Sequence, residues 1–176
     1  EIVKLLERKQ AGFRVLGVTN TPGSPLDSLS DWRVLTKAGP EATVSCKTYL
    51  AALASLAWLE PVLFNEDPAA ALDGLRAAVP AARDYLAGWQ AHVADLEARL
   101  RSTRDLFLVG RGPSLAAVGT GGLIVKEAAH LHAEGMTAAA FRHGPFEMTS
   151  PEAFVLVFAG EGPGAALNRR LYEDVR

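Results

Sequence analysis

Two residues in the second half of the sequence could transfer protons, Glu127 and His143. Glu127 follows the apolar run 123–125 on a predicted helix, and apolar surroundings raise the pKa of a carboxyl group toward neutral pH, where it can act as a general acid or base. A partly exposed glutamate paired with a cation fits the same pattern, although the adjacent Lys126 points to another side of the helix. His143 lies in the stretch 141–145, where an imidazole could move protons near pH 7 or simply face solvent.

A second group of candidates lies in the loop Gly110-Arg111-Gly112-Pro113-Ser114, between an apolar run and a helical pattern. Such a loop presents backbone N–H groups at the positive end of a helix, and this arrangement binds phosphate. A tight turn that needs glycine only for its backbone dihedral angles has the same composition. The loop lacks the third glycine of a dinucleotide fingerprint and the Gly-Lys-Ser/Thr of a P-loop. Its candidate ligand-binding residues are Gly110, Gly112 and Ser114.

A third candidate site is the start of the predicted helix that follows Gly39-Pro40. Ser45 offers a hydroxyl and Lys47 an ammonium group next to free helix N–H groups, which together could hold a polar ligand. A simple helix N-cap is the alternative interpretation. Cys46, between them, is expected to be an inert thiol in the core of a buried helix.

Metal binding is not expected. Glu127 and His130 form one Glu-x-x-His pair on one face of the predicted helix. Carboxylate-bridged metal sites in helix bundles use two such pairs and further glutamates, and the sequence has only one pair. A histidine beside apolar neighbours on a helix is more often packed than bound to metal.

The elements that would position these residues alternate between short apolar strands and longer helical patterns. This alternation predicts an α/β fold with parallel sheets flanked by helices. Strands are predicted at 13–19, 33–36, 106–109 and 153–159, and helices at 2–9, 43–59, 67–100, 115–133 and from Gly162-Pro163 to Tyr172. The domain boundaries that follow are 1–66 for the first lobe, 67–103 for a helical linker and 104–176 for the second lobe.

Composition limits the possible partners. A formal net charge of −2 gives no general attraction to nucleic acid or to an anionic membrane. No apolar run reaches the ~18–20 residues that a membrane-spanning helix needs, and no signal-peptide pattern opens the sequence. The single cysteine excludes an internal disulfide. Together these features predict a cytoplasmic location.

Three stretches in chain order give the sequence a family resemblance. They are 18–26, then 38–41 with 45–49, and finally 109–114 through Lys126-Glu127, His132-Ala133-Glu134 and Arg142-His143-Gly144-Pro145. The sequence resembles the sugar-isomerase (SIS) domain family, which includes the isomerase lobes of glucosamine-6-phosphate synthase and stand-alone amino-sugar-phosphate isomerases and deaminases. The resemblance implies two SIS-type lobes, each a parallel sheet flanked by helices and both incomplete in this chain.

The resemblance also implies roles for three of the candidates. Glu127 matches the glutamate that moves a proton between C1 and C2 of the sugar. His143 matches the histidine that opens the sugar ring and reaches over from the partner subunit of a homodimer. Ser45 matches a serine of the sugar-binding loop. The expected ligand is a sugar phosphate, with no cofactor and no metal.

The function expected from this resemblance is that of an enzyme acting on a hexose 6-phosphate or amino-sugar 6-phosphate, by isomerisation, deamination or amino transfer without its own glutaminase domain. The alternative is a non-catalytic phosphosugar-sensing module. The presence of both Glu127 and His143 favours catalysis, because a sensor needs neither. Ile124, where the family commonly has lysine, departs from the pattern. The main phosphate loop and a lysine-bearing tail are expected before Glu1 and after Arg176, respectively.

Overall fold

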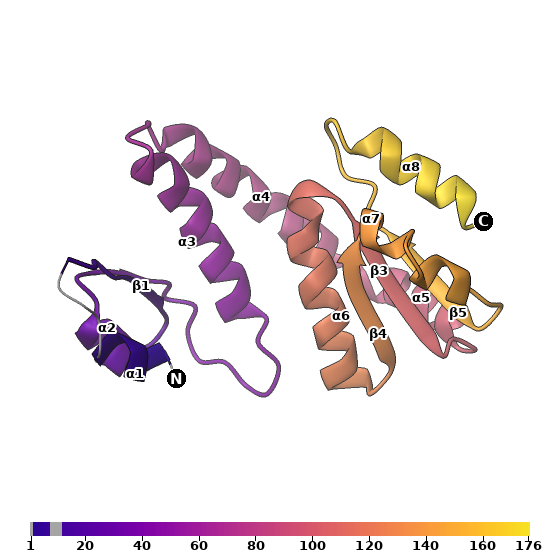
Figure 1. The fold of residues 1–176 in the computed structure, drawn as a ribbon, viewed down its shortest axis with the longest axis horizontal. Helices are drawn as coiled ribbons and strands as arrows, with labels where there is room; N and C mark the ends of the chain where they lie inside the picture. The colour runs from indigo at the N-terminus through magenta and orange to yellow at the C-terminus, as the bar shows by residue number, and fades with distance from the viewer. Residues whose placement is uncertain (1, 8–11) are drawn as a thin grey trace. The chain divides into compact units, whose positions relative to one another are not determined.

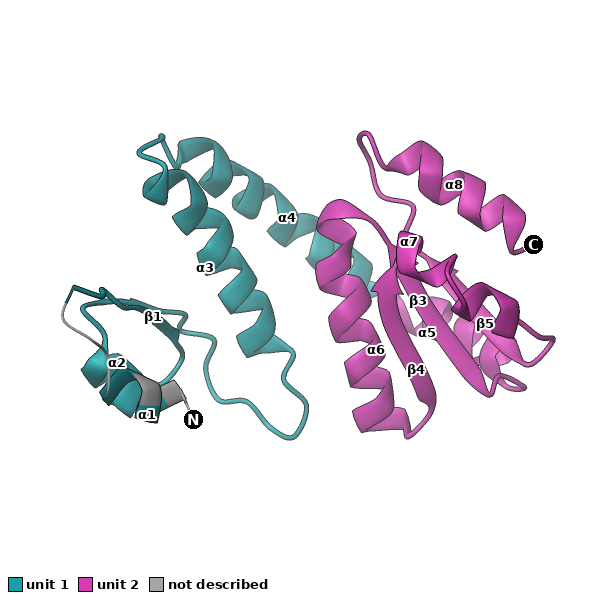
Figure 2. Cartoon of the chain, viewed as in Figure 1, with its two compact units in different colours: residues 1–87 teal, residues 88–176 magenta. Residues whose placement is uncertain are grey.

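The computed structural model of the chain describes residues 2–7 and 12–176. The chain divides into two compact units, residues 1–87 and 88–176 (Figure 2). Each unit contains parallel strands flanked by helices, so the α/β fold predicted from the sequence is confirmed. The division falls inside the segment 67–103 that was predicted as a helical linker. None of the described helices is both long enough and apolar enough to cross a membrane.

The first unit is built around a pair of short parallel strands (Figure 1). In this pair Leu16 lies opposite Trp32 and Thr19 opposite Leu35. Both predicted strands are present in shortened or shifted form, and residues 8 and 9 of the predicted first helix lie outside the described part of the chain. The elements are α1 (Ile2–Glu7), β1 (Leu16–Thr19), α2 (Pro25–Leu29), β2 (Trp32–Leu35), α3 (Lys47–Leu63) and α4 (Ala69–Ala87).

Helix α3 differs from its prediction in position and in burial. It begins at Lys47 rather than at residue 43, because the preceding segment forms a loop whose Glu41 carboxylate accepts a hydrogen bond from the Thr48 backbone. Only Leu59 of this apolar helix is buried. Cys46 is the exposed N-cap residue, so the prediction that it is a core thiol is wrong.

The segment 67–100 forms two helices rather than the single amphipathic helix that was predicted. Helix α4 ends at Ala87, and α5 (Trp89–Leu100) begins after Gly88. The backbone of Gly88 leaves the helical region (φ −130°, ψ 18°), which separates the two helices. Neither α4 nor α5 has a buried side chain, and apolar residues such as Tyr85 and Leu86 are exposed.

The second unit is a three-stranded parallel sheet in the order β4-β3-β5, with helices on both faces (Figure 1). Successive residues of the central strand pack on opposite faces, as the pleat of a strand requires. Phe107 and Val109 pack with Phe141 and Leu171 on one face. Leu106 and Leu108 pack with Val118 on the other. The remaining elements are β3 (Asp105–Gly110), η1 (Gly112–Ser114), α6 (Leu115–Ala129), β4 (His132–Thr137), α7 (Ala138–Phe141), η2 (Pro145–Met148), β5 (Ala153–Val157) and α8 (Ala165–Asp174).

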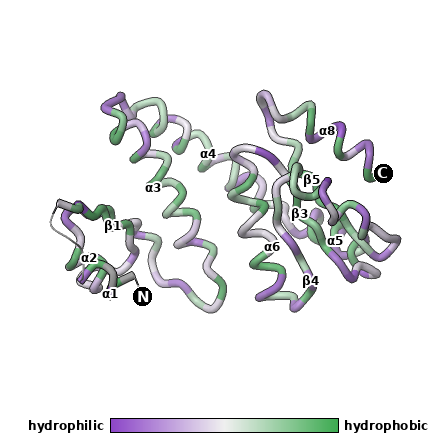
Figure 3. Tube along the Cα trace, viewed as in Figure 1, coloured by the Kyte–Doolittle hydropathy of each residue, from purple (hydrophilic) through white to green (hydrophobic). Residues whose placement is uncertain are grey.

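Strand β4 was not predicted, because its region was assigned to the end of a helix running to residue 133. The helix stops at Ala129, and His130 closes it in the left-handed conformation (φ 53°). His130 is therefore not on a helical face with Glu127, which removes the predicted Glu-x-x-His pair. The remaining predicted strands and the last helix are confirmed. Hydrophilic residues are frequent along α8 but not along α3 (Figure 3).

Two glycines let α6 lie directly on β4. A Cβ atom on Gly122 would come within 2.7 Å of the Gly135 nitrogen, and one on Gly135 would come within 2.2 Å of the Val118 carbonyl oxygen. Both distances are shorter than any normal contact, so this part of the sheet accepts only glycine. The middle of α6 therefore lies directly against the middle of β4.

Candidate functional site

A cavity of about 450 Å³ lies at the carboxyl ends of β3 and β5 in the second unit. The chain leaves β3 toward α6 on one face of the sheet and leaves β5 toward α8 on the other face. Two adjacent strands whose connections diverge in this way create a topological switch point. Ligands of open parallel sheets bind in the crevice at such a point.

The cavity is walled by the loop after β3 and by the loop that leads from β5 into α8. Gly112 and Gly160 both have left-handed backbones, with φ of 58° and 66°. Two helices begin at the cavity, α6 after the turn η1 and α8 after Gly164, and neither has a side-chain cap on its first N–H groups. The first N–H groups of the two helices, those of Leu115 and Ala165, donate to backbone carbonyl oxygens, and what the helix starts offer an anion is the positive end of each helix dipole.

Two of the three loop residues predicted to bind ligand line this cavity, Gly112 and Ser114. Gly110 is buried and is not among the lining residues. A Cβ atom there would come within 3.0 Å of the Ser114 Cβ and 3.1 Å of the Val118 Cγ2. Gly110 is therefore explained by the close packing of α6 on β3, and the structure provides no ligand contact for it.

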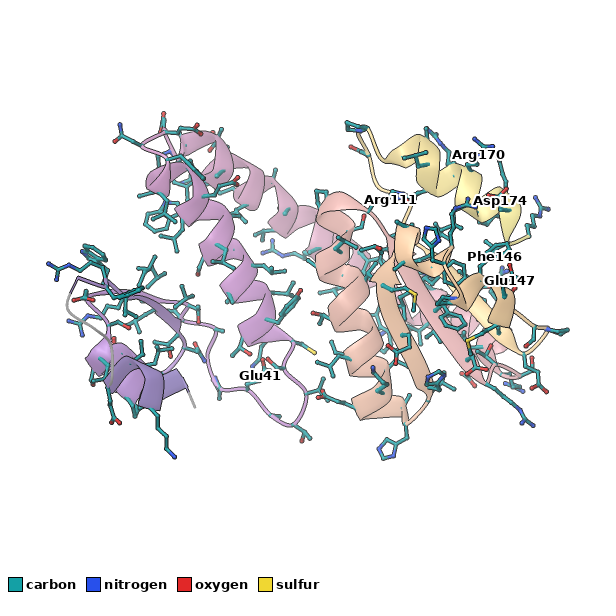
Figure 4. All side chains as sticks on the ribbon, in the orientation of Figure 1. Glu41, Arg111, Phe146, Glu147, Arg170 and Asp174 are labelled. Atoms are coloured by element: carbon teal, nitrogen blue, oxygen red, sulfur yellow. The ribbon has the colours of Figure 1, made fainter. Side chains whose placement is uncertain are left out.

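Sequence reasoning did not single out two other lining residues, Arg111 and Asn168. Arg111 lies in the loop after β3 (Figure 4), and its stem packs against the start of α8, since a Cβ on Gly164 would lie 3.4 Å from the Arg111 Cβ. Asn168 is in the first turn of α8 and is 1% exposed. An asparagine in a polar helix resembles a surface residue in sequence, and the only available signal was the Gly-Pro-Gly turn four residues before it.

In the first unit, Ser45 lies beside a second cavity of about 340 Å³, which is also lined by Thr19, Asn20 and Thr36 at the carboxyl ends of β1 and β2. The Ser45 and Thr48 hydroxyls share a hydrogen bond. The Lys47 ammonium group donates to the Pro40 carbonyl oxygen, and Lys47 is not among the residues that line the cavity. Of the two candidates at this helix start, only Ser45 faces a possible ligand.

Glu41 organises the loop before α3 (Figure 4). Its Oε2 accepts hydrogen bonds from the Thr48 backbone N–H at 2.8 Å and from the Thr48 hydroxyl at 2.9 Å. The backbone hydrogen bond from Thr48, followed by its hydroxyl and the charge of Lys47, holds the pKa of the Glu41 carboxyl below its ordinary value, against a smaller opposing effect of burial. The loop that carries Ser45 is thus tied to α3 by an ionised carboxylate.

Glu127 is exposed in the last turn of α6. The apolar residues before it do not surround its carboxyl group, so the structure does not supply the desolvation that was one of its two predicted environments. The alternative, a pair with a cation, is not found among the ion pairs of the described residues, since Lys126 contacts Glu134 at 3.3 Å. Glu127 is an accessible carboxylate in this structure.

His143 is exposed in the turn that follows α7, where its backbone N–H donates to the Ala140 carbonyl oxygen at 3.0 Å. The preceding residue, Arg142, forms an ion pair with Asp174. Asp174 lies at the end of α8 (Figure 4). This ion pair anchors the turn and leaves the imidazole free to meet a ligand or another surface.

The candidates of the second unit do not form one site. Ser114 and Glu127 lie at opposite ends of α6, which has 15 residues. At 1.5 Å per residue the two ends are about 20 Å apart. A small ligand in the cavity at Ser114 cannot reach Glu127 of the same unit.

A polar cluster lies near Glu127, at the amino ends of β3 and β4. His132 Nδ1 contacts the Asp105 carboxylate at 2.6 Å, and His132 Nε2 lies 3.9 Å from Glu134. Within residues 2–7 and 12–176, no group of three or more His, Cys, Asp or Glu side chains is arranged to hold a metal ion. The cluster links neighbouring strand starts at the surface.

Known proteins similar to this chain are glutamine–fructose-6-phosphate aminotransferases (isomerizing) and proteins of related fold, although no family model matches. The aminotransferase of Pyrobaculum aerophilum is 32% identical over 159 residues, which are 88% of this chain and 26% of that protein. That of Symbiobacterium thermophilum is 35% identical over 155 residues, covering 84% and 25%. The C-terminal domain of glucosamine-fructose-6-phosphate aminotransferase from Francisella tularensis superposes with a TM-score of 0.80 at 19% identity, over 98% of this chain and 51% of that one.

A candidate phosphosugar isomerase from Silicibacter pomeroyi superposes with a TM-score of 0.71 at 28% identity, over 91% of this chain and 48% of that one. The chain is similar to sugar-isomerase (SIS) proteins over most of its length. It spans about a quarter of the length of the curated relatives named above, and about half of the two solved SIS-type chains. The resemblance inferred from the sequence motifs is therefore confirmed at the level of family and fold.

Proposed function

We propose that this SIS chain binds a hexose 6-phosphate or amino-sugar 6-phosphate and belongs to an enzyme of the isomerase, aminotransferase or deaminase type. One observation carries the proposal. The chain is similar over 88% of its length to an isomerising aminotransferase, and its Glu127 and His143 side chains are both exposed at the surface. We place the chain across two SIS-type lobes, with the boundaries predicted from the sequence.

The proposed chemistry is a proton shift between adjacent carbons of the open-chain sugar. In the aldose-to-ketose direction, the Glu127 carboxylate takes the proton from C2. The C–H electron pair forms the C1–C2 double bond of an enediol while the carbonyl oxygen O1 gains a proton. In the second step O2 loses its proton and becomes the carbonyl oxygen on C2. Glu127 then returns its proton to C1. His143, matched by family resemblance, would open the ring beforehand by moving a proton from the anomeric hydroxyl to the ring oxygen.

The family resemblance also suggests that His143 acts in the site of a partner subunit, so we propose a homodimer. The exposure of His143, on a turn fixed by the Arg142–Asp174 ion pair, supports such a role. Sedimentation of the intact protein should show a dimer. A stable monomer with full activity would exclude a shared site.

A phosphosugar sensor without catalytic activity is the second candidate, favoured by the solvent exposure of Glu127. The two candidates differ in hydrogen exchange at the substrate carbons. The intact protein should incorporate deuterium from solvent into C2 of glucose 6-phosphate or glucosamine 6-phosphate, as followed by NMR. Binding without exchange for every hexose and amino-sugar phosphate would establish the sensor.

A further inference from the structure

The cavity at the ends of β3 and β5 contains two buried polar atoms that find no hydrogen-bond partner among the described residues, Arg111 Nε and Asn168 Oδ1. The orientation of the Asn168 amide is fixed, because its Nδ2 donates to the carbonyl oxygens of Phe158 at 2.8 Å and Ala159 at 3.0 Å. The free atom is therefore the acceptor oxygen. A buried acceptor without a donor is costly, so its position in a cavity wall suggests that a ligand supplies an O–H or N–H group.

The same cavity also has groups that favour negative charge. The guanidinium group of Arg111 lies in its wall, and the starts of α6 and α8 border it. Guanidinium donors match the oxygen geometry of phosphate, and helix starts add their positive dipole ends. A Cβ on Gly112 would meet only open space, so the backbone at this turn is accessible to a ligand.

Glu161 is the one carboxylate among the lining residues, and it is exposed at the cavity edge. It would repel a phosphate placed beside it but would accept hydrogen bonds from hydroxyl groups. Together with Asn168 Oδ1 it adds hydrogen-bond acceptors to a cavity whose wall also contains the Arg111 guanidinium group. A ligand that matches these groups has an anionic group and several hydroxyls.

We propose that this cavity is a binding site for a phosphorylated sugar, separate from the site of proton transfer. The phosphate contacts Arg111 and the starts of α6 and α8, and a sugar hydroxyl donates to Asn168 Oδ1. The volume of about 450 Å³ lies within the usual range of roughly 300–1,000 Å³ for small-molecule sites. Because Glu127 lies at the other end of α6, a ligand here is bound without being transformed by that carboxylate, and the proposal does not depend on the proposed enzyme activity.

Amide chemical shifts of the ¹⁵N-labelled protein can test the proposal directly. The protein is titrated with inorganic phosphate, with fructose 6-phosphate and with fructose. Fructose 6-phosphate should shift the amides of Gly112 and Ser114 and those of 160–162, 164 and 165. Inorganic phosphate should shift the same amides at higher concentration, because it cannot reach Asn168 as well, and fructose should not.

A charge-removing variant and a matched control sharpen the test. Arg111→Gln should weaken fructose 6-phosphate binding at these amides by about 10- to 100-fold, the range expected for a lost charge-assisted hydrogen bond. Arg104→Gln removes the same charge from an exposed arginine that pairs with Glu152 at the amino end of β3, and it should leave binding unchanged. The thermal unfolding temperature of each variant shows whether it is folded.

Two results would overturn the proposal, and a third would remove its sugar contact. Shifts confined to residues 38–49 of the first unit would place the phosphosugar site there instead. This result is measured on the parent protein, so it does not depend on whether Arg111→Gln folds. A folded Arg111→Gln protein that binds as tightly as the parent would remove the role of the guanidinium group. If phosphate and fructose 6-phosphate bind equally well, the sugar contact to Asn168 is wrong. None of these results would affect the deuterium exchange that tests the proposed enzyme activity.

Discussion

In both units the parallel strands end at a cavity, but the polar side chains at that edge differ in whether they have hydrogen-bond partners within the chain. In the first unit, Asn20 donates to the Gly39 carbonyl oxygen and accepts from the Ala38 N–H and the Thr36 hydroxyl. In the second unit, one polar atom each of Arg111 and Asn168 is buried with no partner in the described chain. Asn20 at the first edge is satisfied by the chain's own hydrogen bonds, whereas the second edge leaves one donor and one acceptor without a partner in the described chain.

The largest loss of stability is expected from Asn168→Ala in the second unit. The change removes two part-buried hydrogen bonds to the carbonyl oxygens of Phe158 and Ala159 and opens space at a side chain that is 1% exposed. It should lower the free energy of unfolding of the protein by roughly 2–4 kcal/mol. Denaturant unfolding measures the loss. A decrease below about 0.5 kcal/mol would show that the asparagine does not hold this edge together.

A smaller effect is expected from Asn20→Ala in the first unit. Three hydrogen bonds are lost, but they lie in exposed or half-buried positions where water can replace the partners. The free energy of unfolding should fall by about 1–3 kcal/mol. Thr21→Ala, in the exposed turn beside it, serves as the control in the same denaturant series. Equal stability of the Asn20 variant and the parent would mean that the first edge is not closed by this side chain.

The smallest expected effect is a change in how the stability of the protein depends on pH. Hydrogen bonds from Thr48 and the charge of Lys47 hold the pKa of Glu41 below the ordinary glutamate value of 4.5. A carboxyl group whose pKa is lower in the folded state stabilises that state above the unfolded pKa, and the stabilisation is lost as pH falls through the folded pKa. Glu41→Gln should therefore make unfolding less sensitive to acid below pH 4.5, and Glu173→Gln should not. Identical acid profiles for parent and Glu41→Gln would contradict this assignment.

The sequence was sufficient for the fold class, the family and most element positions, because buried strands such as 106–109 and turns such as Gly110–Ser114 leave local signals. Strand β4 was missed because His132-Ala-Glu-Gly-Met-Thr has neither an apolar run nor alternation. Its place depends on contacts between Gly122 and Gly135, which are far apart in sequence. Long-range packing of this kind leaves no local pattern.

The candidate site was predictable only in part. The glycine-rich loop indicated an anion site, and Gly112 and Ser114 do line a cavity. Asn168 could not be found, since its burial follows from the position of α8 on the sheet. The expected desolvation of Glu127 was not found, because apolar residues that precede a side chain on a helix point in other directions and do not enclose it.

The central claim, that Glu127 is the base of a phosphosugar isomerase-type enzyme, is tested most directly by deuterium exchange at C2 of the sugar phosphate in Glu127→Gln. Glutamine keeps the size of the side chain but cannot take up the proton, so exchange should slow by about 10²–10⁴-fold while phosphosugar binding persists. Glu173→Gln, on the exposed side of α8, should exchange at the parent rate. If Glu127→Gln exchanges as fast as the parent, Glu127 is not the base and the account of catalysis is wrong.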